Sequence, residues 1–459
     1  MFICSSCHSS TPKWVGKCPT CGNWNTLEEV TSSEKKLKSL WGKKIQVWKI
    51  QLEYDSLPQK IVSMSAELDS VLWGGIMPGS LILLSGEPGI GKSTLALQMA
   101  EWYAQEWDWE DWVVNTLQRR VLYISGEEHI GQISQRAKRL WVSSNRIDLI
   151  SESNFDDILT TIETHGASII IIDSLSVLSS DSLYWTPGSI TQIRTMTEML
   201  MGVAKRMNIS IVLIGHVTKD GSISWPKSLE HLVDVVLFLE GTRTENYRLL
   251  RAFKNRFWST ENVGLFRMEA TGLIDLPNPG REFINPENAL LAGSALTFTL
   301  EGNRPLLIEI ESLTTYTKFG YPKRSTRWVP QGKLDLLIAV MSKFMKSKLE
   351  NYDVYLNIGR GISLSEPWGD LACIAAMMSS RLDTPLGSTV FLGEVSLTWV
   401  VKSVYALDRR ILEAVKLGFT RIVLPAQYTW ILPSWIDVVR IDRIGQLEGI
   451  VGGTKGDTL

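Results

Sequence analysis

The chain has 459 residues, enough for about three domains with buried cores. Its 44% hydrophobic and 21% charged residues are typical of a soluble globular protein, and no apolar run approaches the roughly 18–20 residues of a membrane-spanning helix. The net charge of −2 excludes a polycation that binds nucleic acid by bulk charge. The first ten residues lack the basic and apolar regions of a secretory signal, so we expect a cytoplasmic protein with no membrane partner.

Two CxxC pairs lie within the first 21 residues. The first pair is Cys4 and Cys7, and the second pair is Cys18 and Cys21. When the chain turns tightly within each pair, the two pairs can bring four thiolates to the corners of a tetrahedron around one Zn²⁺. Two disulfides or unrelated thiols are the alternatives, but a reducing compartment disfavours disulfides. The spacing therefore predicts a zinc knuckle over residues 1–29.

A polar, lysine-rich stretch over residues 30–57 follows the knuckle. It has neither a helical nor a strand period, so we interpret it as a solvated linker, with contacts to a DNA backbone as the alternative.

From residue 58 to 276, short β-rich runs alternate with longer amphipathic stretches, as in βα units around a mostly parallel sheet. The predicted strands are Leu81–Ser85, Val121–Ser125, Ser168–Ile172, Ile209–Ile214 and Val235–Leu239. After a junction rich in Pro, Asn and Gly, residues 289–459 predict a further domain. Its expected elements are strands Leu296–Leu300 and Leu306–Glu311 and helices Leu334–Ser347 and Glu366–Arg381.

A phosphate-binding loop connects the first predicted strand to a helical run. The loop and the residue after it are Gly86, Glu87, Pro88, Gly89, Ile90, Gly91, Lys92, Ser93 and Thr94. Its glycines allow backbone N–H groups to surround a β-phosphate, and the helix N-terminus adds positive potential. Lys92 is expected to reach the β- and γ-phosphates, and Ser93 to offer its hydroxyl to Mg²⁺. The motif predicts binding of a nucleoside triphosphate such as ATP.

Carboxylates at the ends of two further strands complete the expected site. The apolar run over 168–172 ends at Asp173, which we expect to orient the Mg²⁺ shell opposite Ser93. Glu127 and Glu128 follow another strand, and Glu127 is the favoured group to position a water in line with the γ-phosphate. An acid in the first turn of the next helix is the alternative for either residue. His216 could likewise sense the γ-phosphate or be an ordinary loop histidine.

At these residues the chain resembles the RadA (Sms) family of bacterial DNA-repair ATPases over nearly its full length. The resemblance rests on the four cysteines with Trp24-Asn25-Thr26, on the phosphate loop, and on the segments Tyr123–Glu128, Ile214–Gly221 and Lys254–Phe257. The last of these reads KNRFG in the family, and Trp258 departs from it. The final third resembles the domain that the family shares with Lon-type proteases.

The resemblance implies a fold and an activity. The fold is α/β, with a RecA-like P-loop ATPase core, an N-terminal four-Cys zinc knuckle and a C-terminal α+β Lon-protease-like domain. The activity is that of a DNA-dependent ATPase that binds single-stranded and branched DNA and promotes branch migration, with a RecA-type recombinase as partner. In a homo-oligomeric ring a neighbour's cation can reach the γ-phosphate, and Lys254 and Arg256 are the candidates. An exposed basic loop or a DNA phosphate contact is the alternative.

Two other functions compete with this interpretation. An ATP-dependent Lon-type peptidase needs a serine nucleophile and a lysine base, but Asp370 lies near the nucleophile position and cannot serve as the activated hydroxyl. Ser363 and Ser365 are misplaced by several residues. A RecA-fold signalling ATPase would share the phosphate loop, but it has no reason to contain the zinc knuckle or the KNRF segment.

The 18 tryptophans outnumber the 12 phenylalanines and the 11 tyrosines. Several stand where the family pattern has glycine: Trp73, Trp141, Trp225, Trp258 and Trp399. Glycine serves tight turns and close backbone approach, whereas Trp adds bulk and restricts φ. One cause would explain them all, a genome that decodes UGA as glycine while the sequence is written with UGA as tryptophan. The alternative is a genuinely Trp-rich protein whose exposed indoles bind a partner or stack on DNA bases.

Overall fold

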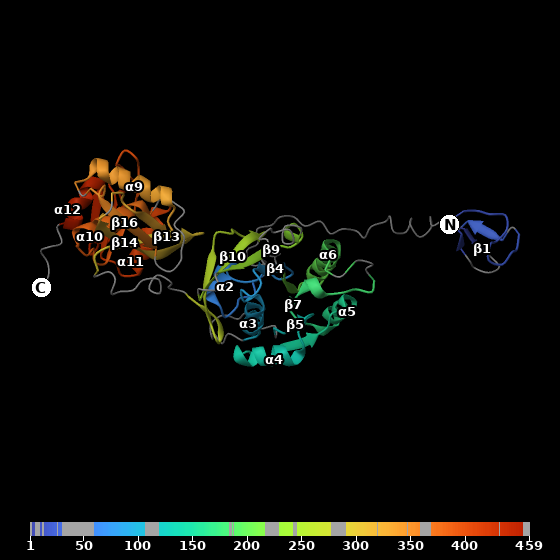
Figure 1. Ribbon diagram of the computed structural model, residues 1–459. Helices are drawn as coiled ribbons and strands as arrows, with labels where there is room; N and C mark the ends of the chain where they lie inside the picture. Colours follow the sequence, from blue (N-terminus) through green and yellow to red (C-terminus); the bar gives the residue numbers. More distant parts are fainter. Residues whose placement is uncertain are drawn as a thin grey trace. The chain divides into compact units, whose positions relative to one another are not determined.

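The computed structural model divides into two units, Met1–Leu57 and Pro58–Leu459 (Figure 1). The residues that it describes are 2–4, 10–11, 13–24, 26–29, 59–105, 119–182, 186, 188–215, 229–241, 246–276, 291–318, 320–346, 348–358, 369–430 and 432–452.

The N-terminal unit contains a small antiparallel sheet. Its strands are β1 (Phe2–Cys4), β2 (Ser10–Thr11) and β3 (Leu27–Glu29), in the order β2-β1-β3. A tight turn between β2 and β3 is closed by two backbone hydrogen bonds, from Gly22 N to Cys18 O and from Cys18 N to Asn23 O, each 2.9 Å long. Gly22 has a φ of 77°, which residues with a Cβ rarely adopt.

A nine-stranded sheet forms the first part of the second unit. Six neighbouring strands are parallel, in the order β9-β4-β8-β7-β5-β6, and three antiparallel strands continue the sheet beyond β9 as β10, β11 and β12. The parallel strands are β4 (Leu81–Gly86), β5 (Val121–Ser125), β6 (Ile147–Ser151), β7 (Ile169–Asp173), β8 (Ser210–Ile214) and β9 (Val235–Glu240). The antiparallel strands are β10 (Tyr247–Asn255), β11 (Val263–Glu269) and β12 (Gly272–Asp275). The five predicted strands are confirmed to within one residue at each end.

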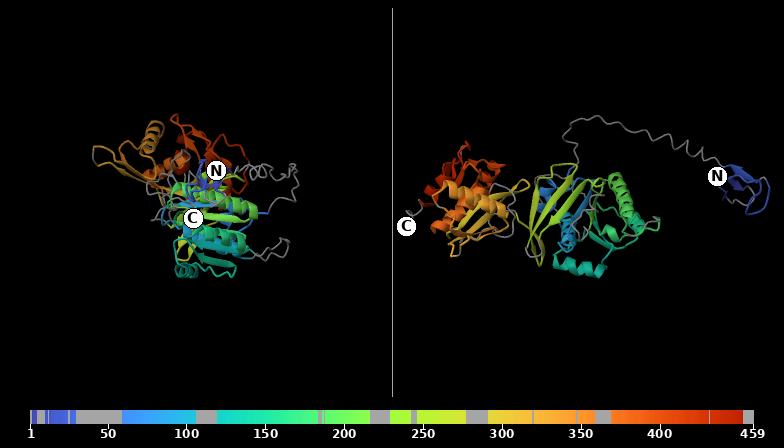
Figure 2. Two further views of the ribbon diagram at one scale, coloured as in Figure 1. Left: turned by 90° about the vertical axis from the view of Figure 1, so that its right-hand side faces the viewer. Right: turned by 45° about the horizontal axis from the view of Figure 1, so that its top comes forward.

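Helices cover both faces of this sheet because its central strands alternate their side chains between two cores (Figures 1 and 2). Ile82 and Leu84 of β4 pack into one core with α2 (Ala66–Val71), α3 (Lys92–Ala104) and α4 (Ile130–Arg139). Leu81 and Leu83 pack into the other core with α5 (Phe155–His165) and α6 (Ile190–Met207). Strands that are buried on both faces read as continuous apolar runs, which is why they were visible in the sequence.

A seven-stranded mixed sheet forms the second part of this unit, in the order β15-β16-β14-β13-β17-β20-β21. Its strands are β13 (Ser294–Glu301), β14 (Arg304–Tyr316), β15 (Arg324–Arg327), β16 (Tyr352–Ile358), β17 (Thr389–Phe391), β20 (Arg421–Pro425) and β21 (Asp437–Ile441). A short hairpin, β18 (Glu394–Val395) and β19 (Val401–Lys402), lies outside it. Helices α9 (Gln331–Phe344), α10 (Asp370–Leu382) and α12 (Leu447–Gly452) pack into one core, and α11 (Leu407–Lys416) packs into the other.

Two features of the helices bear on the predictions. The helix expected over 366–381 begins at Asp370, and residues 359–368 lie outside the described part of the chain. Among the described helices, none has the length together with the apolar character that crossing a lipid bilayer requires.

Candidate functional site

The phosphate loop lies at the carboxyl end of β4 and leads directly into α3. Gly86, Gly89 and Gly91 have φ values of 150°, 79° and 117°, and Gly91 is the left-handed N-cap of α3. A Cβ on Gly86 would lie 2.5 Å from the carbonyl oxygen of Leu239 on the neighbouring strand β9. All three glycines of the motif are therefore required by backbone conformation or space, and the loop ends at the N-terminus of α3, where free N–H groups favour an anion.

Lys92 occupies the first turn of α3 and is only 4% exposed. Its Nζ donates to the carbonyl oxygens of Gly86 and Glu87, each at 2.9 Å. Burial lowers the pKa of Lys92, while Asp173 and Glu127 act in the opposite direction. The ammonium thus lies inside the loop, within electrostatic reach of Asp173 at the end of β7 and of Glu127 after β5.

Asp173 ends β7 beside the phosphate loop. It interacts with the hydroxyls of two residues, Ser93 of α3 and Tyr123 of β5, whose OH donates to Oδ2 at 2.8 Å. Burial raises the pKa of Asp173, and the two hydroxyls oppose that shift. Ser93 and Asp173, 80 residues apart in the chain, therefore lie side by side, and their role at Mg²⁺ stays a prediction. A hydroxyl and a carboxylate are the hard oxygen ligands that fit Mg²⁺.

The two glutamates after β5 have different surroundings. Glu127 accepts a 2.5 Å hydrogen bond from the Ser174 hydroxyl, one residue after Asp173, and acts electrostatically on Lys92. Glu128 instead forms an ion pair with Arg136 of α4. Of the two carboxylates, Glu127 is the one beside the phosphate loop. Its role in positioning water stays a prediction.

Arg248 contacts the phosphate loop, a contact that sequence reasoning missed. It lies on β10, is 7% exposed, and its Nε donates to the carbonyl oxygen of Ile90 at 3.0 Å. Arg248 lies six residues before Lys254, and nothing in the local sequence marks it as a contact of the phosphate loop.

Lys254 and Arg256 lie away from this phosphate loop. Gly86 pairs with Leu239 on β9, whereas Asn255 pairs with Val235, four residues or about 13 Å earlier along the same strand. Lys254 Nζ donates to the carbonyl oxygen of Val233 at 2.9 Å, and Arg256 forms a 3.2 Å ion pair with Asp234. The structure therefore does not bring these two cations to the nucleotide site of their own chain.

The predicted zinc ligands are only partly described. Cys18 and Cys21 lie in the turn that Gly22 closes, and Cys18 is buried. The backbone of Cys4 belongs to β1, whereas Cys7 lies outside the described residues, as does His216. A tight turn with two cysteines separated by two residues fits one half of a thiolate zinc site.

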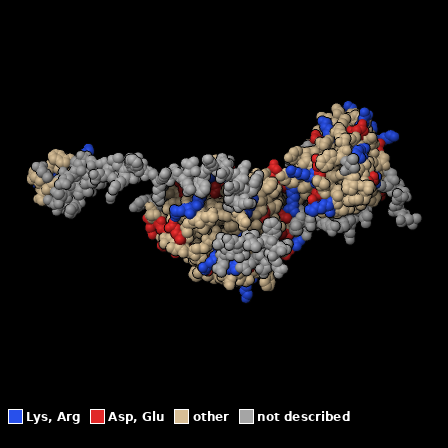
Figure 3. Space-filling view, turned by 180° about the vertical axis from the view of Figure 1, so that it is seen from behind, with Lys and Arg blue, Asp and Glu red and all other residues tan. Residues whose placement is uncertain are grey.

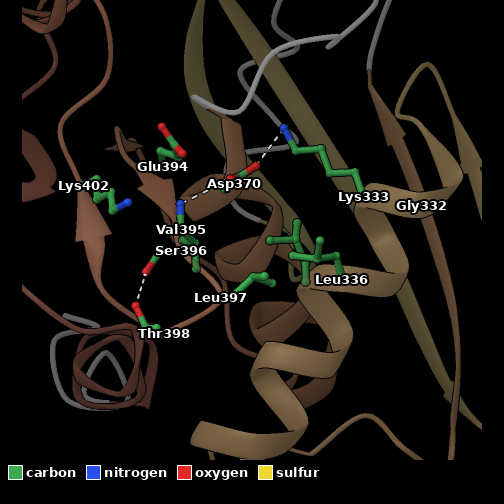
Figure 4. Close-up of a pocket in the computed structure, with 11 residues that line it drawn as sticks. Gly332, Lys333, Leu336, Asp370, Glu394, Val395, Ser396, Leu397, Thr398 and Lys402 are labelled. Atoms are coloured by element: carbon green, nitrogen blue, oxygen red, sulfur yellow. Dashed lines mark hydrogen bonds and ion pairs between the residues drawn. The ribbon is translucent and has the colours of Figure 1, made fainter.

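A pocket in the C-terminal part surrounds Asp370 (Figure 4). Its volume is about 620 Å³, and the N-termini of α9 and α10 and the β18–β19 hairpin line it. Asp370 is 5% exposed, pairs with Lys333 Nζ at 2.7 Å, and accepts from Val395 N. The position near the protease nucleophile thus contains a carboxylate bound to a lysine, which argues against peptidase chemistry here. Ser363 and Ser365 lie outside the described residues.

The charges on the described surface are mixed. On the face drawn in Figure 3, Lys and Arg side chains alternate with Asp and Glu over both sheet-containing parts of the second unit. The described residues on this face therefore do not form a surface of a single charge.

Comparison with known proteins identifies the parts of the chain. An AAA domain family matches residues 61–222, and a rubredoxin metal binding domain family matches residues 2–29. The DNA repair protein RadA of Bacillus subtilis (strain 168) is 38% identical over 463 residues, which cover 98% of both chains. RadA of Streptococcus pyogenes serotype M1 is 39% identical over 457 residues, again 98% of both chains. With its ATPase domain, its metal-binding ribbon and this full-length similarity, the chain belongs to the RadA family of DNA repair proteins.

Proposed function

We propose that this chain is a DNA-dependent ATPase of recombinational repair that binds single-stranded DNA and promotes branch migration of recombination intermediates. The observation that supports its ATPase activity is the grouping of Lys92, Ser93, Asp173 and Glu127 at the carboxyl edge of one parallel sheet. The action on DNA rests on membership in a family whose curated relatives are DNA repair proteins.

Each residue of the group has a distinct role in this proposal. The N–H groups of the loop and the Lys92 ammonium bind the β- and γ-phosphates and offset their charge. Ser93 and Asp173 would hold Mg²⁺, which supplies charge stabilisation to the transferring phosphoryl group. Glu127 accepts a hydrogen bond from the attacking water and orients it, and Ser174 fixes the orientation of that carboxylate.

Lys254 and Arg256 act outside the nucleotide site of their own chain. Their place at the opposite end of β9 supports action either on the nucleotide of a neighbouring subunit in a ring or on a DNA phosphate. The Arg256 side chain is 41% exposed and is held by Asp234 and by the carbonyl of His231. An anchored, partly exposed guanidinium is suited to either target, because the anchoring reduces the entropy lost when it binds.

ATP hydrolysis measured with and without single-stranded DNA tests the proposal. We expect single-stranded DNA to stimulate ATP hydrolysis. Lys92→Ala should abolish ATP hydrolysis both with and without DNA. Lys416→Ala, at a 62% exposed position on α11, is the matched control and should behave like the unchanged protein. A labelled branched junction with a RecA-type recombinase then tests branch migration. Hydrolysis that DNA does not stimulate would contradict the DNA-dependent part.

A mixing experiment separates the two targets of Arg256. If Arg256 acts on a neighbour's nucleotide, Arg256→Ala subunits should recover ATPase activity when mixed with Lys92→Ala subunits, because some interfaces then contain one intact copy of each residue. If it binds DNA, mixing restores nothing and DNA affinity falls, with a smaller dependence on salt. Arg194→Ala, at a 60% exposed position on α6, controls for loss of surface charge.

The N-terminal ribbon is proposed to bind zinc through Cys4, Cys7, Cys18 and Cys21. Cys18→Ser should release the metal and unfold the ribbon. The segment has little hydrophobic core, so the binding energy of the metal supplies most of its folding free energy. The melting of the second unit should not change, because its cores are separate. Metal analysis that finds no zinc in the unchanged protein would overturn the site.

A further inference from the structure

Four tryptophans have a left-handed backbone. Seven described residues other than glycine have a positive φ, and four of them are Trp73 (57°), Trp141 (60°), Trp328 (67°) and Trp399 (62°). For L-residues this conformation places Cβ against the following carbonyl, and bulky side chains are outliers there. Two of the other three residues are Asn208 and Asp383, which belong to the residue types that tolerate it best.

Trp141 follows Leu140, the C-cap residue of α4, in a Schellman motif. Its N–H donates to Lys138 O at 3.4 Å, and the N–H of Val142 donates to Ala137 O at 2.9 Å. These are the two hydrogen bonds that define the motif, and its left-handed residue is usually glycine. The indole is 77% exposed, so it gains little burial to offset the backbone cost.

Trp73 occupies the same place after α2. Its N–H donates to Ser70 O at 3.2 Å, and Gly74 N donates to Asp69 O at 2.6 Å. At comparable helix ends this chain has residues that favour the conformation: Gly166 after α5, Asn208 after α6 and Asp383 after α10. Trp73 and Trp141 thus differ from the residues that this chain has at its other left-handed helix ends.

Trp399 lies in the loop of the β18–β19 hairpin, a different structure with the same requirement. Three residues separate Ser396 from Val400, which are joined by Ser396 N to Val400 O at 3.0 Å, and Trp399 N donates to Ser396 O at 2.9 Å. A three-residue hairpin loop of this kind ends with a left-handed residue that forms a bulge, a position favouring glycine.

We infer that the protein made in the cell has glycine at residues 73, 141, 328 and 399, because its gene contains UGA codons that the cell reads as glycine. Trp328 was not singled out by sequence reasoning and is added by its φ of 67° alone. Trp225 lies outside the described residues, and Trp258 is not among the described residues with positive φ, so the backbone supports the inference at neither of these two.

A binding role for the indoles explains these observations less well. A partner or DNA base would select exposed side chains, whereas the property these residues share is backbone conformation. Their exposure ranges from 77% for Trp141 to a partly buried Trp399 stacked on Phe344 at 5.2 Å between ring centroids. Two belong to loops at helix ends and one to a hairpin, so no common binding surface follows from their local structures.

The gene and the native protein provide the first test. We expect UGA at codons 73, 141, 328 and 399 of the gene. In protein purified from its own cells, we expect each peptide that contains one of these residues to have the mass for glycine, in which a hydrogen replaces the indolylmethyl side chain of tryptophan. UGG at these codons, or tryptophan in the native peptides, would overturn the inference.

Thermal melting of full-length variants provides the second test. Trp141→Gly should raise the Tm of the second unit by on the order of 2 °C, Trp141→Asn by part of that, and Trp141→Ala by little, because alanine retains the Cβ. Trp102→Gly is the matched control, since Trp102 is helical and stacks on Phe266, and it should lower the Tm. An equal rise for Trp141→Ala and Trp141→Gly, or no rise for Trp141→Gly, would contradict the requirement for glycine.

Discussion

Two regions of the second unit place a lysine near an aspartate, but the partners of the two charged groups differ between the regions. In the phosphate loop, Lys92 Nζ donates to backbone carbonyls while Asp173 is held by the hydroxyls of Ser93 and Tyr123. In the C-terminal pocket, Lys333 and Asp370 bind each other at 2.7 Å. A carbonyl can be exchanged for a phosphate oxygen at little electrostatic cost, whereas separating two buried opposite charges is expensive. The first arrangement leaves the charges available for a substrate, and the second uses them to stabilise the fold.

The largest effect is expected for Lys92→Ala, which should lower the rate of ATP hydrolysis by about a hundredfold or more, because the charge that offsets the transferring phosphoryl group is lost. The fold should persist, since removal of a buried ammonium leaves two carbonyls that loop N–H groups or water can satisfy. Steady-state hydrolysis and thermal melting measure the two parts. Normal turnover would show that the loop is not the active site.

Asp370→Asn should destabilise the protein by up to about 3 kcal/mol, because the Lys333 ammonium, whose side chain is only 16% exposed, then lies beside a neutral amide. ATP hydrolysis at a temperature well below melting should not change. Chemical denaturation measures the stability, and the double variant with Lys333→Met should recover part of the loss by removing both charges. A fall in ATPase activity without a fall in stability would contradict a purely structural pair.

Arg248→Met should reduce ATP hydrolysis by about tenfold, since one hydrogen bond to the backbone of the phosphate loop is worth about 1.5 kcal/mol when the donor is charged. Methionine keeps much of the aliphatic volume on β10. Because Arg248 positions the loop and need not touch the nucleotide, Arg248→Lys should restore part of the activity. Unchanged kinetics in Arg248→Met would mean that the loop is rigid without this contact.

The smallest effect is expected for Tyr123→Phe, which removes the hydroxyl that donates to Asp173 at 2.8 Å. Loss of one neutral donor to a carboxylate costs about 1 kcal/mol, or roughly a fivefold reduction in rate. A higher Mg²⁺ concentration should restore part of the rate if Tyr123 orients Asp173 toward the ion. Phe344→Leu, in the core around the C-terminal pocket, is the control and should change neither the rate of ATP hydrolysis nor its dependence on Mg²⁺ concentration.

The phosphate loop, Asp173 and the parallel strands were predictable because each depends on a contiguous segment. A glycine-rich loop between an apolar strand and a helix dictates its own conformation, and a strand buried on both faces has to be apolar throughout. The edge strand β6 and the antiparallel strands β10 to β12 were missed, since they are partly exposed and therefore do not read as continuous apolar runs.

The sequence was sufficient to place Lys92, Ser93 and Asp173 at one edge of the sheet, because Lys92 and Ser93 are neighbours and Asp173 ends a continuously apolar strand. The excess of tryptophan over phenylalanine and tyrosine was also visible in the sequence. The sequence was insufficient for contacts between distant segments: Arg248 with Ile90, Lys333 with Asp370, and Glu128 with Arg136. Those contacts depend on strand register and on the face that each side chain occupies. The left-handed backbone at Trp141 also depends on tertiary structure, because the packing of Leu140 into the core determines where α4 ends.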